Sequence, residues 1–477
     1  MVESTPSAAA RPLLPELWAL LAARRPAFRQ ERTHQRSVAL VLGWLSAFGR
    51  HTVTGVLLVL GMGAVDWTAW HRLFSRGRID YDQLTTCVLG QTLDLSAPTD
   101  PYLVGVDATQ IARHSRTMPG TTWLRHLGTA IFRPGLHRAQ RFVHLAWLPL
   151  PSPTGYSRAV PLRFVPAFPP KAVPVPDHPP RKEWEAGVAA LRWRRVALDG
   201  AGRTTQRVLA LGDGAYSTAS LWAALPDRVT VLARCAKNRA LFALPPAPAL
   251  GTTGRPRRYG ERQPRPDAVL ALRSGWRRVT LTVRGRQIPI QFRVAGPLLV
   301  HGAPDQPLFL LVVKGSDPAR GKRKRVARFF LVSAVADGTG DWTLPWPAAD
   351  LLAWAWQRWE LEVAHRELKT TFGLGEPQAW SPVAAVLTVQ WAAWVYAILV
   401  LAGVRAWGLG PGPVSAPGRW WGGSGRWSLA RLWHGLRQEL WQETGFHRVC
   451  SRTGDDWGKM ADWVGLKTNA ALTASHT

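Results

Sequence analysis

Acidic residues are scarce in this chain, and three of them stand where catalytic carboxylates are expected. The 477 residues include 31 Asp or Glu against 60 Lys or Arg. Asp107 lies near the end of the β-rich apolar run 102–111, Asp213 ends the short apolar run 207–213, and Glu362 lies in a helical segment. Three converging carboxylates can hold two hard divalent ions about 4 Å apart, an arrangement that serves phosphoryl transfer. Oxygen ligands select Mg²⁺ or Mn²⁺ rather than Zn²⁺.

The helical segment around Glu362 carries cations on the same face. Four residues are spaced i, i+4, i+8 and i+11, which places them on one helical face: Arg358, Glu362, Arg366 and Lys369. Glu360 and Glu367 fall on a different side. One interpretation is a salt-bridged solvent face, worth only about 0.2–0.5 kcal/mol per pair. The other is a metal-binding carboxylate flanked by cations that hold a phosphodiester.

The formal net charge of +29 indicates a polyanionic partner, because such an excess opposes compactness by self-repulsion. Nucleic acid is the first candidate and an anionic membrane the second. Two basic clusters follow predicted strands and are candidates for phosphate contact, with plain surface solvation as the alternative. They contain Arg113 and Arg116, and Lys237 and Arg239.

Several classes of protein are excluded or disfavoured by composition. The three cysteines lie far apart and form no CxxC pair, which argues against a disulfide scaffold or a zinc ribbon and indicates a reducing compartment. The N-terminal residues do not show the basic, then apolar, then small-residue sequence that is typical of a secretory signal peptide. The run 383–404 is uncharged and long enough to cross a bilayer, but it follows the acidic helix after a short loop. We therefore expect a buried core helix there and no membrane association.

The order of apolar segments predicts an α/β protein with a mixed sheet, in five parts. These are a helical region 1–98, either a bundle with a solvated basic face or a DNA-binding domain; an α/β core over 99–235; a β-rich insertion 236–326 with a basic cluster at 320–325; the rest of the core over 327–409, including a helix from Pro347 to about Phe372; and a linker with a C-terminal helical tail, 410–477.

Three segments together resemble a known family. RWELEVAHRELK, residues 358–369, resembles the C-terminal motif Tyr-x2-Arg-x3-Glu-x6-Lys of bacterial insertion-sequence transposases of the DDE type. LALGDGAYST, residues 209–218, resembles the motif around the second Asp, and VGVDATQI, residues 104–111, resembles the strand of the first Asp. The 149 positions from Asp213 to Glu362 leave room for the β-rich insertion typical of this branch.

The resemblance implies a ribonuclease-H-like mixed sheet with helices on both faces and Asp107, Asp213 and Glu362 as catalytic metal ligands. It implies a cytoplasmic, nucleoid-associated bacterial enzyme that cuts double-stranded DNA at transposon ends and joins the ends to target DNA, as at least a dimer. Further residues are predicted to bind DNA, with Trp342 stacking on an unpaired base: Arg358, Trp359, Arg366, Lys369 and Trp342.

One position departs from the family motif. Ala355 stands where the motif has Tyr, which in the family helps to hold DNA phosphate. The neighbouring Trp354, Trp356 or Trp359 can compensate for the missing ring. The alternative is a copy that has lost its chemistry and remains a DNA-binding protein of the same fold.

Overall fold

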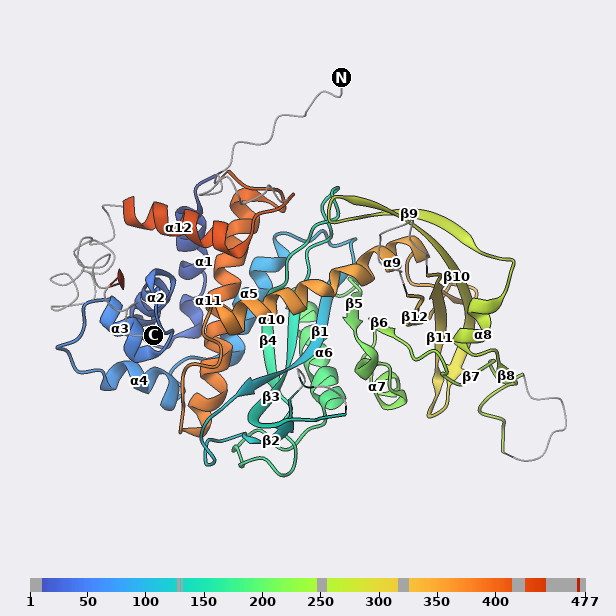
Figure 1. Ribbon diagram of the computed structural model, residues 1–477, viewed down its shortest axis with the longest axis horizontal. Coiled ribbons are helices and arrows are strands. Elements are labelled where there is room, and N and C mark those ends of the chain that lie inside the picture. The colour runs from blue at the N-terminus through green and yellow to red at the C-terminus, as the bar shows by residue number, and fades with distance from the viewer. Residues whose placement is uncertain are drawn as a thin grey trace, which may run out of the picture.

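The computed structural model describes residues 11–126, 129, 132–246, 255–315, 326–413, 425–442 and 470–471. One continuous 12-stranded mixed sheet runs through the molecule, in the order β2-β3-β1-β5-β6-β12-β11-β10-β7-β8, with β4 paired to β3 and β9 to β10 (Figure 1). The predicted basic cluster at 320–325 and most of the predicted linker and tail lie outside the described residues.

The first half of the sheet is the α/β core. Its strands are β1 (Tyr102–Ala112), β2 (Thr122–Arg125), β3 (Leu136–Trp147), β4 (Val160–Pro166), β5 (Val208–Gly212) and β6 (Val229–Arg234). β1 pairs antiparallel with β3 and parallel with β5, and β5 pairs parallel with β6. The buried apolar runs of β1 and β5 suit strands that are covered on both faces. The predicted mixed α/β sheet is confirmed.

The β-rich insertion extends this sheet instead of forming a layer of its own. Its strands are β7 (Leu241–Phe242), β8 (Arg262–Gln263), β9 (Arg277–Val283), β10 (Arg286–Val300) and β11 (Ala303–Val313), followed by β12 (Arg328–Ser333). β12 pairs antiparallel with β6 on one side and with β11 on the other, so it joins the insertion to the core. A small separate hairpin follows, β13 (Val335–Ala336) with β14 (Trp342–Thr343).

Helices cover both faces of the core sheet. Gly105 of β1 faces Leu361 of α10 (Trp359–Thr370), whereas the next residue, Val106, lies against Gly187 of α6 (Glu183–Gly200). Because successive strand residues point to opposite faces, α10 and α6 lie on opposite sides of β1. α9 (Ala348–Gln357) precedes α10, and both cross the front of the strands in Figure 1. Short segments complete this part: η2 (Gly214–Tyr216), α7 (Ala219–Ala223) and α8 (Pro266–Ala271).

A helical bundle around α11 (Pro382–Trp407) flanks the sheet on the side away from the insertion (Figure 1). Its other members are α1 (Leu13–Ala22), η1 (Arg25–Ala27), α2 (Glu31–Ser46), α3 (Val53–Val59), α4 (Thr68–Ser75), α5 (Tyr81–Leu93) and α12 (Leu429–Gln442). α11 packs against β4 and against α1, α2, α4, α5 and α12. It is long and apolar enough to cross a membrane, and 94% of its most apolar window is buried inside the protein. The predicted helical region 1–98 thus shares its core with the chain after the acidic helix.

Candidate active site

The strand register brings the two predicted aspartates to the same level of the sheet. Gly105 pairs with Leu211 in the parallel β1–β5 ladder, and Asp107 and Asp213 each come two residues later. Neighbouring strands lie about 4.8 Å apart, so the two side chains start from adjacent positions. Asp213 also caps η2, because its Oδ1 accepts a hydrogen bond from the Ala215 amide at 2.8 Å.

A glycine sets how closely the third carboxylate approaches. A Cβ at Gly105 would lie 2.0 Å from Cδ1 of Leu361, a distance that no side chain tolerates. The absence of a side chain lets the fully buried Leu361 rest directly on β1. Glu362 is the next residue, and Asp107 points to the same face of β1 as Gly105. Gly105 lies within the VGVDATQI motif, but the sequence pattern did not identify its role.

One arginine joins the first and third carboxylates. Arg358 donates from Nη1 to Oδ2 of Asp107 at 3.2 Å and from Nη2 to Oε1 of Glu362 at 2.5 Å. Arg358 is also the joint between α9 and α10, and its carbonyl accepts the Leu361 amide at 3.0 Å. The predicted helix from Pro347 to about Phe372 is present as α9 and α10, which meet at Arg358, and the backbone of Arg358 keeps right-handed helical dihedral angles.

The electrostatics at Asp107 show a shortage of positive charge. Burial, opposed by Arg358 and assisted by the charge of Asp213, raises the pKa of Asp107 to about 7. Burial lowers the pKa of Lys369, while the charge of Asp107 raises it, so Lys369 lies within electrostatic reach of the site. A desolvated carboxyl with a carboxyl neighbour and one shared guanidinium favours binding of a further cation.

The carboxylate oxygens of Asp107, Asp213 and Glu362 are the ligand type that a hard divalent cation prefers, but their positions in this structure are not those of a closed metal site. Within the described ranges, no three His, Cys, Asp or Glu side chains are grouped closely enough to hold one ion. Instead Asp107 and Glu362 meet on Arg358, and Asp213 stands level with Asp107. The three predicted metal ligands therefore border one site, in which Arg358 occupies the place between two of them.

A fourth carboxylate near the site was missed by the sequence analysis. Glu183 lies in the first turn of α6. Burial raises its pKa, Arg141 lowers it, and the charge of Asp213 raises it again. The pKa of Tyr216 is raised well above its ordinary value by burial and by Glu183, Asp107 and Asp213. The only sequence signal for Glu183 was its position at the start of a helix, just after the Pro-rich segment 169–180.

The family assignment comes from a comparison of the sequence with known families. The sequence model of the family described as DDE superfamily endonuclease matches residues 25–288, more than half of the chain. The chain belongs to this family. The match includes Asp107 and Asp213 and ends before Glu362. A search of curated proteins found no match.

The other two glutamates of α10 have structural partners. Glu360 is 1% exposed and forms ion pairs with Arg284 at 2.6 Å and with Arg426 at 2.5 Å. Both carboxylate oxygens of Glu367 accept a hydrogen bond from Nη1 of Arg158 at 3.1 Å, and Oε2 accepts another from the Tyr396 hydroxyl at 2.6 Å. Both therefore point away from Glu362, as the helical spacing predicted.

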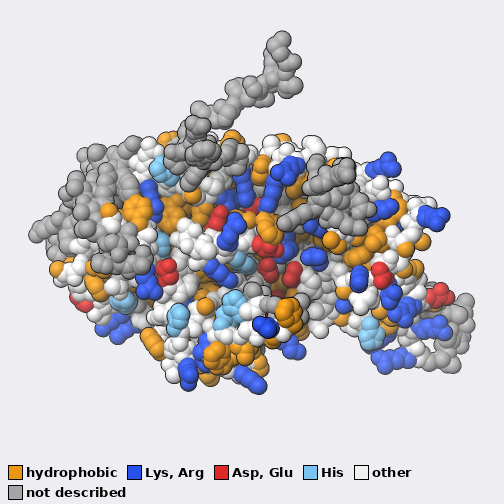
Figure 2. Space-filling view, viewed as in Figure 1, with side chains coloured by type: hydrophobic (Ala, Val, Ile, Leu, Met, Phe, Trp, Pro, Cys, Tyr) orange, Lys and Arg blue, Asp and Glu red, His pale blue; other side chains and the backbone are white. Residues whose placement is uncertain are grey.

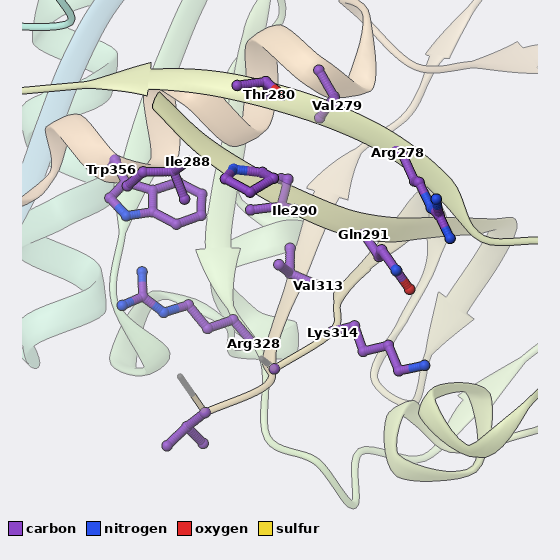
Figure 3. A pocket seen from close by; sticks show the side chains of 13 residues that line it. Arg278, Val279, Thr280, Ile288, Ile290, Gln291, Val313, Lys314, Arg328 and Trp356 are labelled. Carbon is purple, nitrogen blue, oxygen red and sulfur yellow. The ribbon is translucent and has the colours of Figure 1, made fainter. Parts of the chain in front are cut away.

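Two adjoining cavities extend from Glu362 and Arg358 along the insertion. The smaller, of about 340 Å³, is bordered by Glu362, Arg358 and Trp359. The larger, of about 1130 Å³, lies on the β9–β10 face; its described lining includes Arg278, Lys314 and Arg328 and no acid (Figure 3). Arg328 and Trp356 line both cavities, so we treat the two as one groove. In Figure 2, acidic side chains gather in the middle of the face and basic ones surround them.

The remaining predicted DNA contacts fall into three groups. Arg358 and Trp359 border the groove, and Lys369 lies near Asp107. Arg116, Lys237 and Arg366 are exposed, and Arg239 is half-buried, outside the described groove lining. Trp342 is half-buried in β14 and does not line the groove, where Trp356 stands instead.

Arg113 is a correction. Its side chain is buried and donates to Gln140 Oε1 at 2.9 Å and to the carbonyls of Gly375 and Pro377 at 2.9 and 2.8 Å. It fastens the segment after α10 to the sheet and cannot reach DNA phosphate. A basic residue after a strand looks the same in sequence whether it faces solvent or folds back onto carbonyl groups.

Proposed function

We propose that this DDE superfamily protein is a DNA transposase that cleaves strands at the ends of a mobile element and joins them to target DNA. The carrying observation is that Asp107 and Glu362, distant in sequence, meet on the Arg358 guanidinium, with Asp213 level with Asp107 on the neighbouring strand. Family membership supports the nuclease chemistry, and the three sequence motifs support transposition in particular.

Asp107, Asp213 and Glu362 are the residues that would hold Mg²⁺ or Mn²⁺. When bound, such ions supply Lewis-acid activation and neutralise charge that develops on the scissile phosphate. The raised pKa of Asp107 supports this assignment, because a nearby divalent cation stabilises the ionised form that burial disfavours. The charge of Asp107 would then be fully present at neutral pH.

The basic side chains of the groove would orient the DNA. Arg358 and Arg328 border the cavity that Glu362 lines, and Arg278 and Lys314 continue the positive lining along the insertion. Guanidinium groups bind phosphate oxygens in pairs and fix the backbone direction. The net charge of +29 supports double-stranded DNA as the partner. By resemblance we also propose that the protein acts in the bacterial cytoplasm and pairs two DNA ends as a dimer.

The test is Mg²⁺-dependent nicking of DNA that carries the inverted repeats flanking the gene. Asp213→Asn keeps an acceptor for the Ala215 amide but removes the charge, so we expect cleavage to fall more than about 100-fold while binding of the DNA persists. The matched control is Asp350→Asn, an exposed acid in the first turn of α9, which should cut normally. Normal cleavage by Asp213→Asn would contradict the assignment.

A DNA-binding protein without catalytic activity is the second candidate. It is favoured by Ala355, which borders the smaller cavity where the family motif has Tyr. In that case the wild-type protein would bind the terminal DNA but would not nick it at any Mg²⁺ or Mn²⁺ concentration.

A further inference from the structure

Two histidines, one fully buried and one half-buried, form a hydrogen bond beside the carboxylates. Nδ1 of His144, in β3, lies 2.9 Å from Nε2 of His365, in α10. The His144 side chain is fully buried, and its ring stacks on Phe164 with 4.4 Å between ring centroids. No step of the proposed chemistry uses either ring.

The position of the pair links the supports of two catalytic residues. His144 is the direct ladder partner of Asp107 in the antiparallel β1–β3 pair, so both side chains point to the same face of the sheet. His365 comes three residues after Glu362 and therefore lies about one turn further along α10. The hydrogen bond thus runs between the strand beside Asp107 and the helix of Glu362.

Both rings are neutral at ordinary pH, so in the hydrogen bond one ring nitrogen donates and the other accepts. Burial, together with the charges of Lys369 and Arg358, lowers the pKa of His365 to about 3. Burial and His365 likewise keep the pKa of His144 well below its ordinary range.

The donor can be assigned from the other nitrogen of His144. Its Nε2 is buried and has no hydrogen-bond partner among the residues that the structure describes. A proton there would be an orphaned donor, and a buried orphaned N–H is rarer and costlier than an unused acceptor. The proton of His144 therefore lies on Nδ1 and is donated to Nε2 of His365.

We propose that the His144–His365 hydrogen bond is a positioning element that holds Glu362 at its working distance from Asp107 and thereby sets the affinity of the carboxylates for a divalent cation. This inference rests on the proposed function, in which those carboxylates hold the cation. Neither histidine is assigned as a ligand, because Nδ1 of His144 and Nε2 of His365 are engaged in their mutual hydrogen bond.

The test compares variants at position 144 with a control on the same helix. His144→Leu removes the donor, whereas His144→Asn places an amide N–H near the former Nδ1. Tyr396→Phe is the control, because it removes an equally buried hydrogen bond to Glu367 of α10 that does not lead to β1 or β3. The DNA-free full-length proteins are titrated with Mn²⁺ by calorimetry, and Tm is measured alongside.

We expect His144→Leu to weaken Mn²⁺ binding about 10-fold or more, as loss of a supporting hydrogen bond does in other metal sites. His144→Asn should restore binding to within about threefold of wild type. Tyr396→Phe should lower Tm without moving the Mn²⁺ midpoint. A heteronuclear NMR spectrum of ¹⁵N-His protein should show Nδ1 of His144 protonated.

The inference is overturned if His144→Leu binds Mn²⁺ as wild type does, if His144→Asn is no better than Leu, or if Tyr396→Phe shifts the midpoint equally. If wild type binds Mn²⁺ but never cuts DNA, the proposed function fails while the order of midpoints still decides the positioning role. If wild type binds no Mn²⁺ at millimolar concentration, both fail together.

Discussion

The two sides of α10 both carry carboxylates and arginines, but the ion pairs on one side stabilise the fold and those on the other leave room for a bound cation. On the side that faces away from Glu362, Glu360 has two arginines to itself, and Glu367 has Arg158 and the Tyr396 hydroxyl. On the other side, Asp107 and Glu362 share Arg358. A carboxylate with its own cations is a structural element, whereas the largely buried Asp107, which shares Arg358 with Glu362, has a raised pKa and favours a further cation. A divalent ion can supply that positive charge.

The largest expected effect separates the two sides by activity. Glu362→Gln should reduce cleavage more than about 100-fold with little change in Tm, because the loss falls on cation binding and not on packing. Glu360→Gln should leave the folded protein active. Single-turnover nicking with Mg²⁺, corrected for the folded fraction, measures both, and equal activity losses would erase the distinction between the two sides.

The free energy of unfolding should rank the same two variants in the opposite order, with Glu360→Gln the more strongly affected. Glu360→Gln leaves Arg284 and Arg426 without their buried counter-charge, so we expect the free energy of unfolding to fall by about 2–4 kcal/mol. Denaturant unfolding at pH 7.5 in EDTA measures it, with Glu362→Gln alongside. A Glu360→Gln protein as stable as wild type would show that this ion cluster is not structural.

The pH dependence of stability extends the comparison to Asp107, which lies on the Glu362 side of α10. The folded pKa of Asp107, about 7, lies above its unfolded value, so the folded protein holds the extra proton and loses stability as pH rises from about 4 to 7. Asp107→Asn removes this loss and should be more stable than wild type by about 2–4 kcal/mol at pH 8 in EDTA, with the gap closing toward pH 4. A gap that does not depend on pH would mean that Asp107 is already fully compensated by Arg358.

The smallest expected effect concerns the groove. Arg278 is exposed and lines the larger cavity, so Arg278→Gln should weaken DNA binding severalfold and reduce the slope of log K against log salt by about one. Lys171→Gln, an exposed lysine outside the groove lining, is the control. Binding measured at three salt concentrations distinguishes them, and equal slopes would remove the groove from the DNA path.

Part of this site was predictable because its signals are local. An apolar strand followed by an acid indicated β5 and Asp213, whereas β1 continues to Ala112, so Asp107 lies in mid-strand and not near the strand end as predicted. The helical spacing also placed Glu360 and Glu367 on a different side from Glu362. The mixed sheet followed from the order of strands and helices, and the domain boundaries remain predictions.

The other part depends on contacts between distant segments. The burial of Arg113 by the carbonyls after α10, and the bond between His144 and His365, join residues more than 200 positions apart. No local pattern records such pairs.

What the sequence determined by itself is the mixed α/β order of elements, the large positive charge, and two aspartates in or directly after apolar strands with a glutamate on a helix. Only the tertiary structure decided that Asp107 and Glu362 share one arginine, that the insertion continues the sheet, and that α11 is covered by helices from the other end of the chain. The physical reason is that period and burial are encoded residue by residue. Proximity across the fold is set by packing, such as the contact that the missing Cβ of Gly105 allows Leu361 to make.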